Sequence, residues 1–292
     1  MNNDKSIINL GDLSKPAMVL IEKISDAVGG LFKPFQIVRV ARAEAEAERI
    51  RADSQIQISD LQRRAFHRWL EEEARKQQNM EEITRQALPQ LDDTSKPGQI
   101  EDDWITNFFD KCRLISDSEM QSLWSRVLAG EASSPGAYTK RTVNFLSSLD
   151  KSDAQLFTNL CTFAWQIGDI VPLIYDVQAE IYIKWGVSFN SLKHLDSIGL
   201  IQFDSLTGYR RVKLPKRFAV LYYGTPSVLE LQKEVDNEIR IGHVLLTKVG
   251  QELAPICGSQ PDTEFREYIL LKWKEMGYIK EEKTEQPPGT DG

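Results

Sequence analysis

Histidine and cysteine are the residue types in this chain best suited to bind a metal or attack a substrate, and neither type is clustered. The three histidines, His67, His194 and His243, lie in separate regions. No CxxC, HxxxH or HExxH spacing occurs, although zinc sites draw ligands from such pairs. The sequence therefore predicts no zinc site and no metal or other cofactor.

The short motifs that mark common catalytic sites are also missing from the sequence. Neither GxxxxGK[ST] nor GxGxxG is present, so no phosphate-binding loop is indicated. No GxSxG motif occurs, and no cysteine–histidine pair can be recognised from spacing. We predict no catalytic residue and a non-enzymatic protein, with an unrecognised site built from distant residues as a weaker hypothesis.

The three cysteines, Cys112, Cys161 and Cys257, are far apart and odd in number. Each lies in an apolar segment with helical patterning. We interpret them as buried reduced thiols of a cytoplasmic protein, not as a disulfide or metal framework. The first residues lack the layout of a secretory signal, and no run of about eighteen apolar residues could span a bilayer.

Basic residues are concentrated in one segment of an acidic chain. The formal net charge is −7, whereas residues 184–217 contain seven Lys or Arg and only two Asp. A predicted helix over 188–197, followed by a predicted hairpin from 200–203 to 209–214, resembles the recognition helix and wing of winged-helix domains. Phosphate contacts would then come from Lys193, His194, Arg210, Arg211 and Lys213.

The alternative for this segment is a protein-interaction module whose basic charge is incidental. The predicted recognition helix carries Lys193 and His194 but no arginine, and Asn190 is its one candidate for reading a base. A dedicated DNA-binding helix is therefore the less favoured interpretation.

The most densely patterned segment is 116–142, which reads SDSEMQSLWSRVLAGEASSPGAYTKRT. Ser116 and Glu119 have the spacing of a capping box, which predicts the start of a helix. That helix is expected to end at Gly130, and Pro135-Gly136 marks a turn before the next helix.

Three residues of this segment are candidates for a structural motif. We expect Trp124 in the core and a buried ion pair between Glu131 and Arg141 that fixes the angle between two helices. The alternative is that Arg141 and Lys140 bind an anionic ligand.

Long helical patterns dominate the N-terminal part of the chain. An amphipathic helix is predicted within residues 1–33, capped by Ser14 and ended by Gly29-Gly30. Residues 34–91 predict one long helix, because no Pro or Gly interrupts Pro34 to Leu88. Its apolar stripe is narrow and breaks the heptad pattern. Such a helix should pack on a neighbour, fold back, or assemble with copies of itself.

The rest of the chain is predicted to form a helical domain over 101–168 and a winged-helix-like α+β domain over 169–278. Strands are indicated over 170–175 and 179–185, and the tail, 279–292, has the composition of a disordered segment. The predicted fold class is mainly α, with a long N-terminal helix, a helical domain and a C-terminal α+β winged-helix-like domain.

Two segments, QSLWSRVLAGE and PGAYTKRT, are the most specific part of a wider pattern that includes KPFQIVRVARAEAEAERI, LDKSDAQLF and LTKVGQELA. Together these segments resemble a bacterial family of unknown function found among prophage and mobile-element genes. The helices over 101–168, with the GLI element that follows, are also similar to the abortive-infection alpha family of phage-defence proteins. Neither family supplies catalytic residues. The resemblance implies a non-enzymatic helical protein that acts in antiphage defence.

The leading hypothesis is an interaction or assembly protein, a sensor or effector of abortive-infection type. Its N-terminal helices would self-associate or bind another protein, including a phage component. A membrane surface is a disfavoured partner, because the first helix lacks a basic polar face. The alternative hypothesis is a DNA-binding regulator that uses the basic hairpin.

Overall fold

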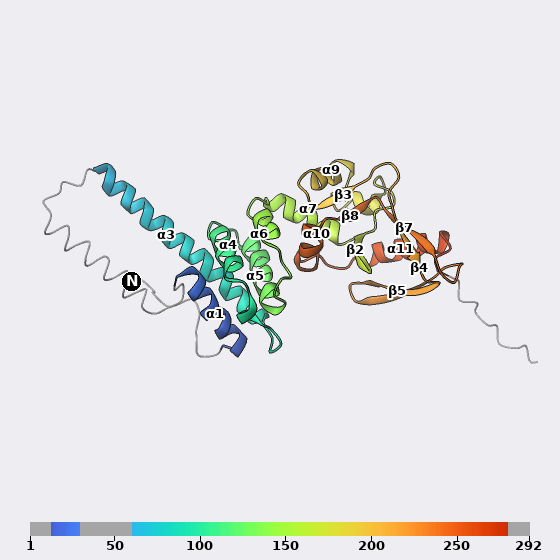
Figure 1. Ribbon diagram of the computed structural model, residues 1–292. Helices are drawn as coiled ribbons and strands as arrows, with labels where there is room; N and C mark the ends of the chain where they lie inside the picture. Colours follow the sequence, from blue (N-terminus) through green and yellow to red (C-terminus); the bar gives the residue numbers. More distant parts are fainter. Residues whose placement is uncertain (1–12, 30–59, 280–292) are drawn as a thin grey trace, which may run out of the picture. The chain divides into compact units, whose positions relative to one another are not determined.

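The computed structural model describes residues 13–29 and 60–279, which Figure 1 shows in colour. The chain divides into two compact units, Met1–Leu149 and Asp150–Gly292. In its described residues the first unit is helical, whereas the second combines helices with antiparallel strands. None of the helices that the structure describes is both long enough and apolar enough to cross a membrane.

The N-terminal helix is docked on the first unit. Helix α1 (Lys15–Val28) follows Ser14, whose side chain accepts a hydrogen bond from the backbone N–H of Ala17 at 3.3 Å. The helix ends at Gly29, which has a φ of 87°. Both predicted ends are confirmed. The apolar face of α1 packs on helix α4 (Asp102–Cys112) and on the 3-10 turn η3 (Pro97–Gln99), so the face is buried within the unit.

Helix α3 (Asp60–Ala87) is docked over its second half. Asn79, Ile83, Thr84 and Ala87 are buried, and this half packs mainly against helix α5 (Ser118–Ser133). Every residue from 60 to 75 is exposed. In Figure 1 this first half extends beyond α4 and α5.

Aromatic side chains hold the helices of the first unit together. Trp104 and Phe108 of α4 stack with ring centroids 5.1 Å apart, and Phe108 meets Trp124 of α5 edge to face at 5.2 Å. Trp124 is fully buried, which confirms its predicted core position. Helix α6 (Lys140–Leu146) completes this core by packing on α4.

The second unit contains one larger sheet and two short ladders, all antiparallel. The sheet has the strand order β2-β1-β5-β6, and the ladders pair β3 with β8 and β4 with β7. The sheet strands are β1 (Ala164–Ile167), β2 (Asp169–Pro172), β5 (Arg217–Tyr222) and β6 (Thr225–Glu230). The ladder strands are β3 (Ile201–Phe203), β4 (Tyr209–Leu214), β7 (Asn237–Gly242) and β8 (Val244–Leu246).

Helices complete the second unit around an aromatic core. They are α7 (Lys151–Cys161), α8 (Glu180–Ile183), α9 (Phe189–Ser197), α10 (Lys248–Leu253), the 3-10 turn η4 (Ala254–Ile256) and α11 (Thr263–Glu275). Helix α11 contributes Phe265 and Trp273, both fully buried. Trp273 meets Trp165 of β1 with ring centroids 4.6 Å apart, and Phe265 meets Phe163 at 4.8 Å.

The predicted fold class, mainly α with a long N-terminal helix, is wrong. The described residues form a mixed α+β protein with eight strands in small antiparallel sheets. Helix α3 begins at Asp60 in the structure. The part of the long helix that was expected over 34–59 lies outside the described residues. The two-unit division falls inside the predicted helical domain of 101–168, since α7 and β1 belong to the second unit.

Two predicted elements of the second unit differ from the structure for tertiary reasons. Residues 179–185, expected as a strand, contain the short helix α8, because Tyr182 turns inward and donates its hydroxyl proton to the carbonyl of Leu173 at 2.7 Å. The expected hairpin between 200–203 and 209–214 is absent, because β3 and β4 each pair with a strand far along the chain. The winged-helix-like description depended on that hairpin.

Candidate functional site

The motif of residues 116–142 folds as a docking loop around a buried carboxylate. Glu131 is 3% exposed. Its two carboxylate oxygens accept hydrogen bonds from the backbone N–H groups of Gly136 at 2.7 Å and Tyr138 at 2.9 Å. One acidic side chain on α5 thus satisfies two donors of the loop that follows, which fixes the loop against the helix.

A glycine and two aromatic residues complete this loop contact. A side chain at Gly130 would clash with the ring of Tyr138, since its Cβ would lie 2.5 Å from a ring carbon. The carbonyl of Tyr138 accepts a hydrogen bond from the indole Nε1 of Trp104 at 2.7 Å. The spacing of Gly130, Glu131 and Tyr138 is therefore explained by packing and hydrogen bonding alone.

The structure corrects three details that the sequence predicted for this motif. Arg141 is exposed, so the predicted buried ion pair with Glu131 is wrong; Glu131 binds backbone groups instead. Helix α5 continues through Gly130 to Ser133. Its N-cap is Asp117, not Ser116, because the Asp117 side chain accepts from two backbone N–H groups of the first turn.

The residues predicted to contact nucleic acid lie in the second unit, where carboxylates from other segments join most of them. Arg210 pairs with Glu238 at 2.5 Å, and Arg211 pairs with Asp169 at 3.2 Å. His194 Nε2 lies 2.8 Å from the carboxylate of Asp153 on α7. These acidic partners come from outside residues 184–217, which is why the local sequence charge did not reveal them.

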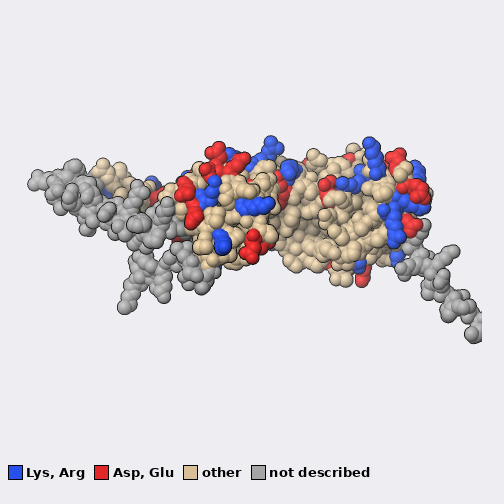
Figure 2. Space-filling view, turned by 60° about the horizontal axis from the view of Figure 1, so that its bottom comes forward, with Lys and Arg blue, Asp and Glu red and all other residues tan. Residues whose placement is uncertain are grey.

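Lys216, further along the same basic segment, is also paired with a carboxylate. Glu234 lies 2.5 Å from the ammonium of Lys216 and raises the pKa of that group. On the face that Figure 2 shows, Lys and Arg side chains lie among Asp and Glu side chains. Lys193 and Lys213 are exposed, on α9 and on β4 respectively, so the structure places them on different elements. The predicted residues do not form one basic face.

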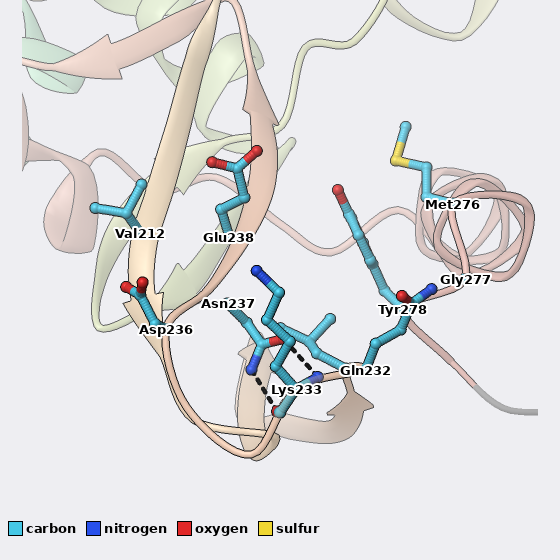
Figure 3. A pocket seen from close by; sticks show the side chains of 10 residues that line it. Val212, Gln232, Lys233, Asp236, Asn237, Glu238, Met276, Gly277 and Tyr278 are labelled. Atoms are coloured by element: carbon cyan, nitrogen blue, oxygen red, sulfur yellow. Dashed lines mark hydrogen bonds between the residues drawn. The ribbon is translucent and has the colours of Figure 1, made fainter.

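A pocket of about 350 Å³ lies beside the end of the β4–β7 ladder and the residues that follow α11. Figure 3 shows the side chains around it. Asn237 is buried in its wall and bonds twice to the backbone of Lys233, accepting from its N–H at 3.0 Å and donating to its carbonyl at 2.7 Å. This asparagine holds the 232–237 loop in place.

Two further polar side chains of this pocket are bonded within the fold. Glu238 pairs with Arg210. The hydroxyl of Tyr278 accepts from the backbone N–H of Arg240 at 3.1 Å. The remaining charged groups, on Lys233 and Asp236, are exposed. The lining contains no pair of nucleophile and base, so the arrangement indicates no particular chemistry. Within residues 13–29 and 60–279, no group of three or more His, Cys, Asp or Glu side chains is arranged to hold a metal ion.

The surface that most needs a functional explanation is the exposed half of α3. It carries Leu61 at 68% exposure and Trp69 at 53%, and Phe66 stacks on Trp69 with ring centroids 5.9 Å apart. Leu61, Ala65 and Trp69 are spaced four residues apart and therefore lie on one side of the helix. Large exposed apolar side chains gathered on one helix commonly mark an interaction surface.

Within residues 63–73 of this half, positive charge precedes negative charge. Arg63, Arg64 and Arg68 precede the run Glu71-Glu72-Glu73. Ion pairs form within the helix between Arg63 and Asp60 and between Arg68 and Glu72, both at 3.4 Å. Exposed pairs of this kind contribute little to stability.

The fold and these surfaces define an α+β protein with a docked N-terminal helix and an exposed helical segment. A family model described as "Protein of unknown function (DUF2806)" matches residues 63–270. The chain belongs to this family, which confirms membership of an uncharacterised family. Neither the curated proteins nor the solved structures compared with the chain gave a match.

Sequence reasoning identified the α3 stripe but missed two other features. The docking of Tyr138 over Gly130 had a local signal, because a Pro-Gly turn between two helices returns the chain onto the first helix. The approach of Cys161 to Cys257 had none, since the two residues are far apart in the chain and lie on different elements.

Proposed function

We propose that this protein is a non-enzymatic assembly protein that pairs with a second copy of itself through the exposed half of α3. The observation that carries the proposal is the exposure of every residue from 60 to 75, although this segment includes Leu61, Phe66 and Trp69. Pairing two copies would remove this apolar surface from water, which favours association by roughly 25 cal/mol per Å².

The division of charge favours an antiparallel pair. In a pair centred near Arg68, Arg63 and Arg64 of one copy lie opposite Glu73 and Glu72 of the second copy. The two Arg68 side chains meet at the centre of this pair, where each also has Glu72 of its own helix beside it. A parallel pair would instead bring all three arginines of both copies together, and like charges at close range oppose association. The irregular stripe supports a short contact and not an extended coiled coil.

The solution mass of the full-length protein, measured by light scattering over a range of concentrations, tests this proposal. The chain has a mass of 33.3 kDa, and we expect twice that value. The double substitution Leu61→Ser with Trp69→Ser should return the mass to that of a monomer. Leu114→Ser is the matched control, because Leu114 is 67% exposed in the same unit and Leu61 is 68% exposed. A monomer at every concentration would contradict the proposal.

A charge exchange tests the antiparallel arrangement separately. One variant carries Arg63→Glu with Arg64→Glu, and the second carries Glu72→Arg with Glu73→Arg. Each variant alone should be monomeric, because the facing segments then have the same sign. An equimolar mixture should form a heterodimer, and added salt should weaken it by screening. Equal association of both variants alone and mixed would reject the antiparallel pair.

We further propose that this assembly acts in antiphage defence, as a sensor or effector of abortive-infection type. The support is the sequence resemblance alone. The test is the plating efficiency of a panel of phages on bacteria that express the protein, compared with the Leu61→Ser/Trp69→Ser variant. Defence that is lost in this variant but kept in Leu114→Ser would link the function to α3. Equal plating on all strains would reject the defence role and leave the assembly proposal standing.

The alternative function, a DNA-binding regulator, has less support. The hairpin on which it depended is replaced by two separate ladders, and Arg210 and Arg211 are paired with carboxylates. We expect no gel shift of random duplex DNA at physiological salt, because three of the five residues predicted to contact phosphates have carboxylate partners.

A further inference from the structure

Two of the three cysteines meet in the second unit, where their positions are fixed by hydrogen bonds. Cys161 is the last residue of α7, and Cys257 follows η4. The hydroxyl of Thr158, one turn before Cys161, donates to the carbonyl of Cys257 at 3.1 Å. The hydroxyl of Tyr223 lies 3.1 Å from the carbonyl of Cys161 and 2.6 Å from the hydroxyl of Ser259.

The two cysteines differ in character. Cys161 is 2% exposed, and the thiol of Cys257 donates to the carbonyl of Ala254 at 3.2 Å. The neighbouring Cys161 side chain is the largest influence that lowers the pKa of Cys257 to about 6; Ser259 acts in the same direction, while burial opposes them. Burial raises the pKa of Cys161 instead. Cys257 is partly exposed, so it is both the more nucleophilic and the more accessible of the two.

Cys112 provides a contrast within the same chain. It is fully buried in the first unit, and burial raises its pKa. The thiol points to the carbonyl of Phe109 in its own helix, at 4.0 Å. A buried thiol in such surroundings is chemically inert. The sequence interpretation of three buried thiols therefore holds for Cys112 and Cys161 but not for Cys257.

We propose that Cys161 and Cys257 are an oxidation site at which hydrogen peroxide converts two thiols to an intramolecular disulfide. The Cys257 thiolate attacks one peroxide oxygen, the O–O bond breaks, and the released hydroxide takes a proton to leave as water. Cys257 is then a sulfenic acid. Cys161 sulfur attacks the Cys257 sulfur, the S–O bond breaks, and the oxygen leaves as a second water with the Cys161 proton. The cysteines lose two electrons and the peroxide gains them.

The test is a thiol map of the full-length protein after hydrogen peroxide. The protein is treated at pH 7, the remaining thiols are alkylated under denaturing conditions, and the peptides are analysed by mass spectrometry without reduction. We expect a linked pair of peptides that contain Cys161 and Cys257, lighter by two hydrogens than the separate peptides, with Cys112 alkylated. Oxygen added to Cys257 while Cys161 stays alkylatable would overturn the proposal, as would a disulfide between two chains or no reaction.

A second measurement uses the reduced protein and tests whether the pair is coupled. The alkylation rate of Cys257 by iodoacetamide should rise through a midpoint near pH 6, because the thiolate is the reactive form. The groups around this sulfur are the carbonyl of Ala254 and the side chains of Cys161, Thr158, Tyr223 and Ser259. Cys161→Ala should move the midpoint upward, whereas Cys112→Ala should leave it unchanged. An equal midpoint in both variants would contradict the pairing of the two thiols.

Discussion

The two halves of helix α3 have opposite surroundings, and composition does not explain the difference. The first half is exposed although it carries Phe66 and Trp69. The second half is docked although it contributes the polar residues Asn79 and Thr84 to the interior. Burial in this helix is thus decided by what the neighbouring helices offer, not by how apolar each turn is.

Hydrogen bonds explain how the polar half can be buried. The amide of Asn79 donates to the carbonyl of Arg113 at 2.9 Å and accepts from the side chain of Gln121 at 3.3 Å. Thr84 donates its hydroxyl proton to the carbonyl of Met80 at 2.9 Å. Since satisfied polar groups cost little in an interior, α4 and α5 can accept this half. The docked half therefore supports the fold, whereas the exposed half is available for association.

The largest effect is expected from a truncation in the docked half. Ile83 is fully buried, so Ile83→Ala should lower the free energy of unfolding by about 2–5 kcal/mol through lost burial and a cavity. Leu61→Ala removes an aliphatic side chain from the exposed half and should change it by less than about 0.5 kcal/mol when both variants are measured at a concentration that keeps the protein monomeric. Urea unfolding followed by circular dichroism measures both. Similar losses in the two variants would remove the distinction between the halves.

A smaller effect is expected from the buried amide. Asn79→Ala leaves the carbonyl of Arg113 and the amide of Gln121 without this partner, which should cost about 1–3 kcal/mol. Gln78→Ala, at the exposed neighbouring position, is the control for helix propensity. The same urea experiment separates them. If Asn79→Ala proved as stable as Gln78→Ala, hydrogen bonding would not be the reason that this half is docked.

Local features of the fold were predictable from the sequence where a short stretch decides them. Ser14 and Gly29 end α1 as expected, because a capping side chain and a left-handed glycine act within one turn. Helix α9 also lies where the pattern predicted, over Phe189–Ser197.

Features that depend on distant segments were not predictable from one sequence. Strand β3 was assigned to a hairpin with β4, but its partner is β8, more than forty residues along the chain. The positive charge of 184–217 was read without Asp169 and Glu238, which neutralise Arg211 and Arg210 from other strands. Pairing and charge compensation of this kind are decided by the tertiary fold, which the local pattern does not contain.

The smallest effect is expected from the ion pair between Arg68 and Glu72, which join successive turns of the exposed half of α3 at 3.4 Å. Arg68→Ala should lower the free energy of unfolding by no more than about 0.5 kcal/mol, because exposed pairs four residues apart are screened by water and salt. The urea midpoint measures this, and Gln62→Ala on the same half controls for removing a long side chain. A loss above 1 kcal/mol in Arg68→Ala alone, well beyond the range known for exposed pairs, would mean that this half is held by its own charges.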